Sequence, residues 1–199
     1  MTKAFRVLFI GNSYTTRNDL PELIKSLAAQ EGNAAPIETE VIAFGGASLA
    51  AHWNRGDAQR ALAGQRWDAV VLQEQSSRPM RALESMRKHA RLFVDAIRQS
   101  GARPILYMTW RRRDQPESGS IIAAAYRDLS IETGCGLAAV GEAWIEAEAR
   151  HPDVCLYDDD KSHPSFAGSL VAARSIFESL FERAAKSRED APLSGGAPT

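Results

Sequence analysis

Short runs of apolar residues recur along the chain between segments whose apolar residues are spaced three or four positions apart. The runs of strand length are Phe5–Ile10, Ile37–Ala43, Asp68–Leu72, Pro104–Thr109 and Gly136–Val140. Most of them are almost continuously apolar, which is typical of strands buried on both faces in a parallel sheet covered by helices. The second run instead alternates apolar and polar residues, so we expect it near an edge of the sheet.

The segments between these runs carry the apolar stripe of an amphipathic helix. They are Leu20–Gln30, Arg81–Gln99, Ile121–Thr133 and Phe166–Ala185. At or near three of the helix ends lie residues suited to a left-handed backbone, namely Asn33, Gly101 and Gly134. Strands that alternate with helices predict right-handed crossovers and an α/β fold, a three-layer α/β/α sandwich around a five-stranded parallel sheet.

The length of 199 residues suits one α/β domain with a sizeable core. We therefore predict a single domain over residues 1–186. The remaining segment, 187–199 (SREDAPLSGGAPT), has almost nothing to bury, which predicts a disordered tail.

Composition indicates an ordinary soluble protein, with 44% hydrophobic and 25% charged residues. A net charge of -1 gives no reason to expect nucleic acid or an anionic membrane as partner. The two cysteines, Cys135 and Cys155, lack metal-ligand spacing and fit small core residues in a reducing compartment. The apolar run Val7–Ile10 is too short for a secretory signal or a membrane span, so we expect a cytoplasmic protein.

In a parallel sheet of this kind, ligands bind beyond the carboxyl ends of the strands. This rule selects five segments: Gly11–Thr16, Phe44–Leu49, Gln73–Pro79, Trp110–Asp114 and the loop before the last helix. In the first of them, VLFIGNSYTT, Ser13 lies at a strand-to-helix turn, where backbone N–H groups and the helix dipole favour a developing negative charge. A serine nucleophile needs such a place and a base, although a plain turn or N-cap serine fits the same pattern.

His163 is the best candidate for the base. It belongs to the polar loop DDDKSHPSFAG ahead of the last helix, three residues after Asp160. At this spacing the carboxylate can accept a hydrogen bond from Nδ1–H, which leaves Nε2 free as the base. The simpler alternative for this loop is a helix cap formed by Ser162 or Ser165.

The other three histidines occupy positions that are explained by structural roles. His89 lies inside a predicted helix among charged neighbours, and His151 lies at a helix end before a proline. His52 follows GGASLAA on a short helix, where we expect a surface position, with a position facing the site as the alternative.

Four motifs, FIGNSY, GGAS, VVLQEQSS and DDDKSHP, occur in the order found in the SGNH/GDSL hydrolase superfamily. The chain resembles this superfamily from Phe5 to about Ala185, and within it the subgroup with a GNS turn and a Gln-rich third block. The resemblance implies a flavodoxin-like SGNH hydrolase fold and ester hydrolysis by a serine nucleophile, with a small-molecule ester as substrate.

The resemblance also implies roles for individual residues. Ser13 matches the nucleophile, and its own N–H matches one donor of the oxyanion hole. Gly46 matches a second backbone donor, with Gly45 as the neighbouring alternative. His163 matches the base and Asp160 the residue that orients it.

The third block departs from the pattern of the superfamily. An Asn of a Gly-x-Asn-Asp motif usually supplies the third oxyanion donor, whereas this chain has Gln73, Glu74, Gln75 and Ser76. A Gln amide is the same donor on a longer stem, and we expect Gln75 in this role, or Gln73. Asn12 stands where Asp is more usual, and we expect it to brace the turn through backbone hydrogen bonds.

The substrate is only broadly indicated. Trp110 and Arg111–Arg113 follow the fourth strand, and Arg78 follows the third. An aromatic face suits a sugar and arginines suit a carboxylate or phosphate, but a solvated basic loop with a half-buried Trp fits equally well. Short loops without a long lid favour small acyl groups, such as acetyl on a carbohydrate, over long lipids.

Two alternatives remain open at this stage. A non-catalytic member of the superfamily that binds a sugar or protein is consistent with the Gln-rich block. A flavin-binding module is suggested by the hydroxyl-rich GNSYTTRN turn, with Trp110 or Trp53 beside the ring. We expect no cofactor and no metal, since the only acidic run, YDDDKSH, lacks the Gly and Glu of a calcium loop.

Overall fold

The computed structural model describes residues 3–32 and 35–189. Five parallel strands form its sheet in the order β2-β1-β3-β4-β5, and their bounds are β1 Phe5–Gly11, β2 Ile37–Ala43, β3 Ala69–Leu72, β4 Arg103–Tyr107 and β5 Gly136–Ala138. The order confirms the predicted parallel sheet and places β2 at an edge, as its alternating pattern indicates. The register pairs Gly11 with Ala43 and Ile10 with Leu72, so the segments after β1, β2 and β3 leave the sheet side by side.

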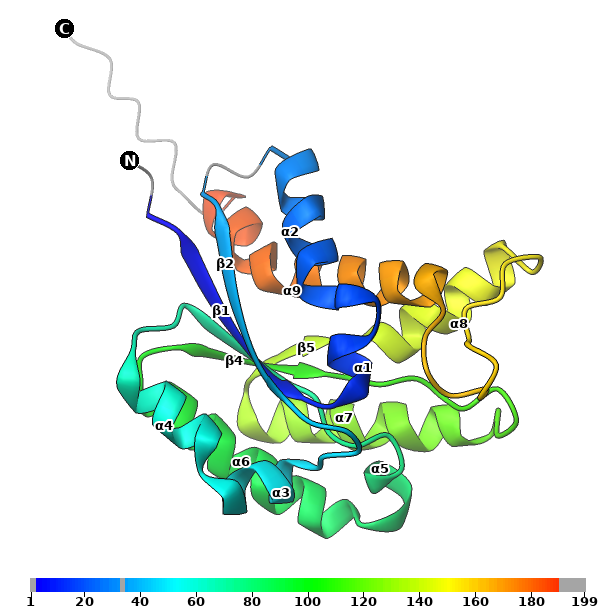
Figure 1. Cartoon of the computed structure of the whole chain (residues 1–199), viewed down its shortest axis with the longest axis horizontal. Coiled ribbons are helices and arrows are strands. Elements are labelled where there is room, and N and C mark those ends of the chain that lie inside the picture. The colour runs from blue at the N-terminus through cyan, green and yellow to red at the C-terminus, as the bar shows by residue number, and fades with distance from the viewer. Residues whose placement is uncertain (1–2, 33–34, 190–199) are drawn as a thin grey trace, which may run out of the picture.

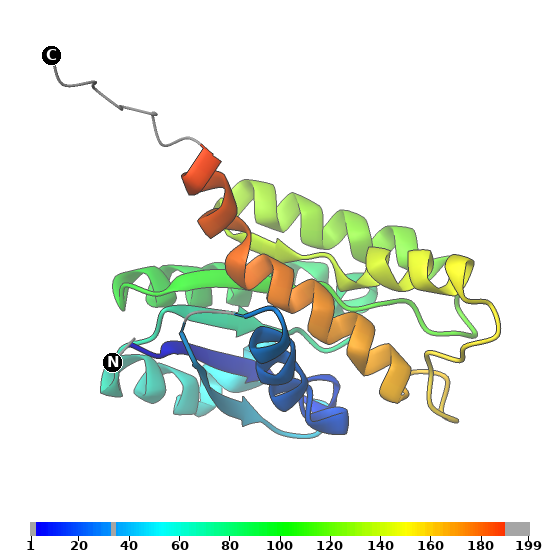
Figure 2. The same ribbon diagram turned by 90° about the horizontal axis from the view of Figure 1, so that it is seen from above.

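Two layers of helices cover the sheet (Figure 1). One face carries α2 (Leu20–Gln30), α8 (Val140–Arg150) and α9 (Phe166–Glu189). The other face carries α3 (Leu49–Arg55), α4 (Asp57–Gly64), α6 (Leu83–Gln99) and α7 (Ser118–Thr133). Figure 2 looks onto the first layer, where α9 lies between α2 and α8 and packs against both. The predicted α/β/α sandwich is confirmed.

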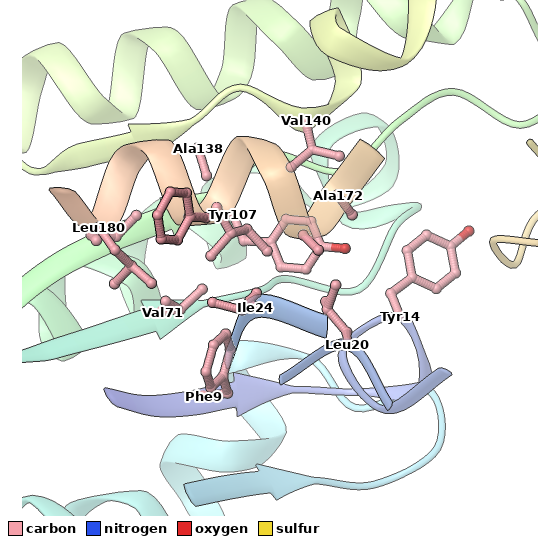
Figure 3. Close-up of a cluster of buried hydrophobic side chains, with 14 of the residues drawn as sticks. Phe9, Tyr14, Leu20, Ile24, Val71, Tyr107, Ala138, Val140, Ala172 and Leu180 are labelled. Carbon is pink, nitrogen blue, oxygen red and sulfur yellow. The ribbon is translucent and has the colours of Figure 1, made fainter. Parts of the chain in front are cut away.

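Successive residues of β1 explain why the runs are apolar without interruption. Val7 and Phe9 point into the core under α2 and α9, while Leu8 and Ile10 point into the core under α3 and α6, and all four are 0% exposed. A strand between two helical layers needs apolar residues at every position. Figure 3 shows the first of these cores, in which Phe9, Val71 and Tyr107 from neighbouring strands lie in one cluster with Ile24 and Leu180 from α2 and α9.

Several element bounds differ from those predicted. Val140 begins α8 and does not continue the fifth strand. The end of this helix is predicted at His151, but its start is not, because only Val140 and Trp144 are fully buried and the apolar stripe is weak. The helix α6 begins at Leu83, because Ala82 is not helical. Helix α9 extends to Glu189, so it includes residues 187–189 of the predicted tail; residues 190–199 and Asn33 lie outside the described residues.

The two cysteines have different surroundings. Cys135 is buried, as predicted, but Cys155 is exposed and contradicts the expectation of a core thiol. It lies in the loop between α8 and α9, where its sulfur is 3.5 Å from Nη1 of Arg113.

Among the described residues, no helix is long and apolar enough to cross a membrane.

Candidate active site

The turn after β1 is fixed by Asn12 and carries Ser13 at the start of the short helix α1 (Ser13–Thr16). Oδ1 of Asn12 accepts a hydrogen bond from the N–H of Tyr14 at 3.1 Å, which caps the helix. Nδ2 of Asn12 donates to the carbonyl of Ala47 at 2.9 Å. Asn12 therefore braces the turn as expected, and it also ties the turn to the segment after β2.

Gln73 supports the same turn from below. Its Oε1 accepts from the N–H of Asn12 at 2.8 Å and from the hydroxyl of Thr15 at 3.0 Å, and its Nε2 donates to the carbonyl of Glu74 at 2.6 Å. Because this amide is fully buried and bonded on both sides, Gln73 is not the third oxyanion donor, and that alternative is wrong. Gly11 must be glycine, since a Cβ there would overlap Thr15 and Gln73.

The structure brings Ser13, His163 and Asp160 together at the carboxyl end of the sheet. Oγ of Ser13 lies 2.7 Å from Nε2 of His163, across 150 positions of sequence. Nδ1 of the same imidazole is hydrogen-bonded to Oδ2 of Asp160. With the proton on Nδ1, Nε2 has its lone pair free to accept the serine proton, as a general base requires.

Asp160 is itself held by backbone groups. Its Oδ1 accepts from the N–H groups of Ser162 at 2.9 Å and His163 at 2.8 Å. Burial works to raise the pKa of Asp160, but the hydrogen bonds from His163 and Ser162 outweigh it and lower the pKa to about 2. The carboxylate is therefore ionised and available to the imidazole at any pH near neutrality.

The loop that carries His163 is fastened to the segment that follows Ser13. The hydroxyl of Tyr14 lies 2.5 Å from Oγ of Ser162, and Arg17 forms an ion pair with Asp158. Figure 1 shows α1 and this loop, between α8 and α9, at the same end of the sheet. In Figure 3 the Tyr14 hydroxyl points out of the apolar cluster.

Asn18 provides a third link between the segment after Ser13 and the region around His163. Its Nδ2 donates to the carbonyl of Pro164 at 3.1 Å and to the hydroxyl of Ser169 at 2.9 Å. The sequence does not predict the supporting roles of Tyr14 and Asn18, although both residues lie within the stretch SYTTRN that begins at Ser13. Ser165 caps α9 through the N–H of Gly168, at 3.1 Å, as one of the simpler alternatives proposed.

Trp110 supports the site from beneath and does not offer a face to a ligand. Its ring stacks on Tyr14 on one side, at 4.6 Å between centroids, and on Trp144 on the other, at 4.1 Å. Its Nε1 donates to the carbonyl of Ser162 at 3.0 Å, and it is 1% exposed. The prediction that Trp110 stacks on a sugar, or on a flavin ring, is therefore wrong, because both of its faces are covered.

Among the described residues, the backbone N–H groups of Ser13 and Gly46 have no acceptor. Gly46 has φ +66 in the turn that Asn12 ties down through Ala47, a conformation that favours glycine. Gln75 holds its Oε1 on the N–H and the hydroxyl of Ser77, at 2.9 and 2.8 Å. Its Nε2 has no acceptor among the described residues and remains available as a donor.

Glu74 joins the segments that carry these donors. One oxygen, Oε1, accepts from the N–H of Leu49 at 3.1 Å and from the N–H of Gln75 at 2.7 Å. The side chain is 2% exposed, and this burial raises its pKa, although the two backbone hydrogen bonds and the charge of Arg78 oppose the shift. A single buried carboxylate thus sets the spacing between the turn after β2 and the loop after β3.

His52 differs from the predicted surface position. It is 1% exposed and packs against Phe44, and its Nε2 lies 2.7 Å from the carbonyl of Gly11. Burial lowers its pKa, and the neutral ring donates to Gly11 behind the nucleophile turn. His151 is the exposed C-cap of α8, as predicted, whereas His89 lies in α6 as predicted but is half-buried, with Nδ1 2.7 Å from the carbonyl of Ser85, and is not a solvated side chain.

Only one of the three candidate substrate-binding residues borders a cavity beside the site, and that is Trp110, whose faces are covered. Arg111 forms an ion pair with Glu148 of α8, 2.7 Å away, and does not line this cavity. Arg112 lines the cavity in its place. Arg78, in α5 (Arg78–Arg81), is half-buried and acts on Glu74 through its charge.

The structure also has a cavity far from Ser13 and His163. This larger cavity of about 410 Å3 lies at the opposite end of the sheet, lined by Arg103 and Gly136 among others. Within residues 3–32 and 35–189, no three His, Cys, Asp or Glu side chains are grouped as metal ligands.

A parallel α/β/α sandwich with a Ser–His–Asp chain at the carboxyl edge of its sheet is the arrangement of a serine hydrolase. A protein from Slackia heliotrinireducens, named as a candidate SGNH hydrolase, is 33% identical over 89% of this chain and 99% of its own, with a TM-score of 0.77. The chain therefore belongs to the SGNH/GDSL hydrolase superfamily.

More distant solved structures share the fold. The psychrotrophic esterase EstA from Pseudoalteromonas sp. is 13% identical, with a TM-score of 0.67 over 90% of this chain and 98% of its own. The acetyl xylan esterase AlAXEase is 14% identical, with a TM-score of 0.70 over 87% and 98%. No family model matches the chain, and a search of curated proteins found no match.

Proposed function

We propose that this protein hydrolyses esters of small acyl groups, above all acetyl esters on a carbohydrate, by two-step acyl transfer through Ser13. The observation that carries the proposal is the contact of 2.7 Å between Oγ of Ser13 and Nε2 of His163, with Asp160 on the other ring nitrogen. A nucleophile, a base and an orienting carboxylate then stand in one hydrogen-bonded line.

In the first step, Oγ of Ser13 attacks the ester carbonyl while its proton passes to Nε2 of His163. The carbonyl oxygen becomes an oxyanion, which the N–H groups of Ser13 and Gly46 and Nε2 of Gln75 stabilise. Such donors contribute because they are fixed before the charge develops. The tetrahedral intermediate collapses, the C–O bond to the alcohol breaks, and His163 returns the proton to the departing oxygen.

In the second step, water attacks the acyl group on Ser13. His163 takes a proton from this water, and the same donors hold the second oxyanion. When the C–O bond to Ser13 breaks, the proton returns to Oγ and the acid leaves. Asp160 stays ionised throughout, since its pKa of about 2 lies far below working pH.

The preference for small acyl groups follows from the short loops around Ser13, and the preference for a carbohydrate as the alcohol follows from the polar cavity that adjoins the His163 loop. The wall of that cavity is rich in hydroxyl, amide and guanidinium groups, which suits a carbohydrate better than an alkyl chain. An acetyl xylan esterase is among the proteins that share the fold, which is consistent with such a substrate.

The alternatives fit the site less well. In the flavin alternative the turn hydroxyls face a phosphate, but Thr15 donates to Gln73 and Ser13 contacts His163. Trp53, the other ring considered, packs edge-on against Phe93. A non-catalytic binder has no need for an imidazole held between a serine and an ionised carboxylate.

A fluorophosphonate probe tests the proposal directly. It should label Ser13 in the wild type, as located by mass spectrometry, and should not label Ser13→Ala. Hydrolysis of p-nitrophenyl acetate should exceed that of the octanoate, and preference for the octanoate would overturn the small-acyl assignment. A protein that leaves the probe unreacted while folded would be a binder and not an enzyme.

A further inference from the structure

A cavity of about 280 Å3 lies between the loop after β3 and the loop after β4, at the carboxyl end of the sheet where Ser13 and His163 meet. Arg112, in its wall, donates to the carbonyl of Asp160 at 3.3 Å. Trp110, also in its wall, donates to the carbonyl of Ser162. The cavity thus adjoins the loop that carries His163, and Gln75, the proposed oxyanion donor, lines its other side.

Most of the wall is polar. Its hydrogen-bonding side chains come from both loops, from α5 and from the start of α7: Gln75, Ser76, Ser77, Arg81, Arg112, Asp114, Gln115 and Ser118. An alkyl chain placed here would remove these groups from water without replacing their hydrogen bonds, which is costly. A ligand with several oxygen atoms would satisfy them.

The charges of the wall do not cancel. Arg112 is partly neutralised by Asp114, whose Oδ1 lies 3.4 Å from Nε of the guanidinium. The side chain of Arg81 has no hydrogen-bond or ion-pair partner among the described residues, and it is exposed at the cavity. The wall therefore carries an excess positive charge on a guanidinium whose planar donors match a carboxylate.

The position of His163 indicates which part of the ester the cavity holds. The imidazole must deliver its proton to the departing alcohol oxygen, so the alcohol lies on the side of the His163 loop. That loop is the one that Arg112 and Trp110 contact from the cavity wall.

We propose that this cavity binds the alcohol part of the ester and that Arg81 selects alcohols that carry a carboxylate. The inference rests on the proposed function, since it assigns a place to the leaving group of that reaction. It adds a substrate class, an acyl ester of an acidic hydroxyl compound, to the acyl preference argued above.

Two probe esters of equal shape test the proposal, 4-acetoxybenzoate and 4-acetoxybenzamide. In Arg81→Gln, kcat/KM for the benzoate should fall about tenfold, the value of one charge-assisted hydrogen bond, while kcat/KM for the benzamide stays the same. Arg66→Gln, an exposed arginine at the opposite end of the sheet, is the matched control and should change neither. Comparing each variant with the wild type cancels the intrinsic difference between the two phenols.

A binding measurement separates this inference from the function on which it rests. Calorimetry should show that 4-hydroxybenzoate binds the wild type more tightly than 4-hydroxybenzamide and that Arg81→Gln removes the difference. Hydrolysis of both esters with an unchanged ratio in Arg81→Gln overturns the inference and leaves the esterase intact. If neither ester is hydrolysed, the esterase proposal fails, and the calorimetric result alone supports or overturns the anion site.

A further probe tests whether the anion site binds the alcohol part or the acyl part of the ester. Hydrolysis of 4-nitrophenyl succinate, which carries its carboxylate on the acyl part, should respond to Arg81→Gln no more than hydrolysis of the acetate. A selective tenfold loss for the succinate would place the anion site on the acyl side and overturn the assignment to the alcohol.

Discussion

Oγ of Ser13 and Nε2 of His163 lie 2.7 Å apart although 150 positions separate them along the chain. This contact depends on interactions between the two segments that carry them. These are hydrogen bonds between Tyr14 and Ser162 and between Asn18 and Pro164, and an ion pair between Arg17 and Asp158. Each of these pairs joins a residue just after Ser13 to a residue within the His163 loop, so the contact is built into the fold.

Replacement of Ser13 or His163 by alanine should abolish most of the activity. Each variant should lower kcat for p-nitrophenyl acetate by at least about 10³-fold, and the double variant should lose little more, because residues that act as a unit are not additive. Melting temperatures should stay close to the wild type, since neither side chain is part of the apolar core. Turnover by Ser13→Ala at the wild-type rate would remove the serine from the mechanism.

Asp160→Asn tests the orienting role. The amide keeps an oxygen for the N–H groups of Ser162 and His163 but places an NH2 group against Nδ1, which favours the wrong tautomer. We expect kcat to fall by about 10²- to 10⁴-fold with little change in KM. An unchanged kcat, or a fall in kcat matched by an equal rise in KM, would show that Asp160 does not orient the base.

The same carboxylate predicts a dependence of stability on pH. Because its folded pKa is lowered to about 2, Asp160 stabilises the protein above its unfolded pKa of about 3.9, and this contribution is lost as pH falls toward 2. The difference in melting temperature between wild type and Asp160→Asn should be constant from pH 7 to pH 5 and should shrink below pH 4. A difference that grows in acid contradicts the sign of the shift.

How far the sequence predicts this structure depends on whether a feature is local. Residues Ile37–Ala43 and Leu20–Gln30 match their predicted bounds because periodicity alone defines a strand or a helix. The rule that ligands bind beyond the carboxyl ends of parallel strands places Ser13 at the site. His163 comes from the loop between two helices, α8 and α9, which contacts with Tyr14 and Arg17 hold beside Ser13. The sequence does not predict the direction in which a side chain points, because contacts between distant segments determine it.

Three residues illustrate this limit. Gln73 and Gln75 are equivalent donors in sequence, but the first bonds Asn12 beneath the turn while the second leaves its amide nitrogen free. Trp110 follows a strand and so lies near the site, yet Tyr14 and Trp144 cover it from elements that no local pattern relates to it.

Glu74 should act as a positioning residue for the oxyanion hole. Glu74→Ala leaves the buried N–H of Leu49 without an acceptor, at a cost of about 1–3 kcal/mol, and also removes the acceptor of the partly buried N–H of Gln75. It also frees the Gly46 turn from the Gln75 loop, so kcat should fall by about tenfold or more while KM changes little.

Rescue separates positioning by Glu74 from a general loss of structure. Glu74→Gln keeps an oxygen acceptor of the same shape and should recover most of kcat. Glu84→Ala, an exposed glutamate on α6, is the control and should leave both parameters unchanged. A Gln variant as slow as the Ala variant would show that the charge, and not the acceptor, is required.

His52 should make the fold sensitive to mild acid. Burial lowers its pKa, the hydrogen bond to Gly11 and the charge of Asp57 oppose this shift, and the charge of Arg55 adds to it. The unfolded chain takes up a proton at the ordinary value of about 6.5 while the folded ring resists, so stability falls as pH drops below that value. In His52→Gln the amide can still donate to Gly11 but does not titrate. Between pH 7 and pH 5 the melting temperature of the wild type should therefore fall more than that of His52→Gln, with His89→Gln as the control that falls like the wild type. Parallel curves for wild type and His52→Gln would show that this imidazole is not the acid-sensitive group.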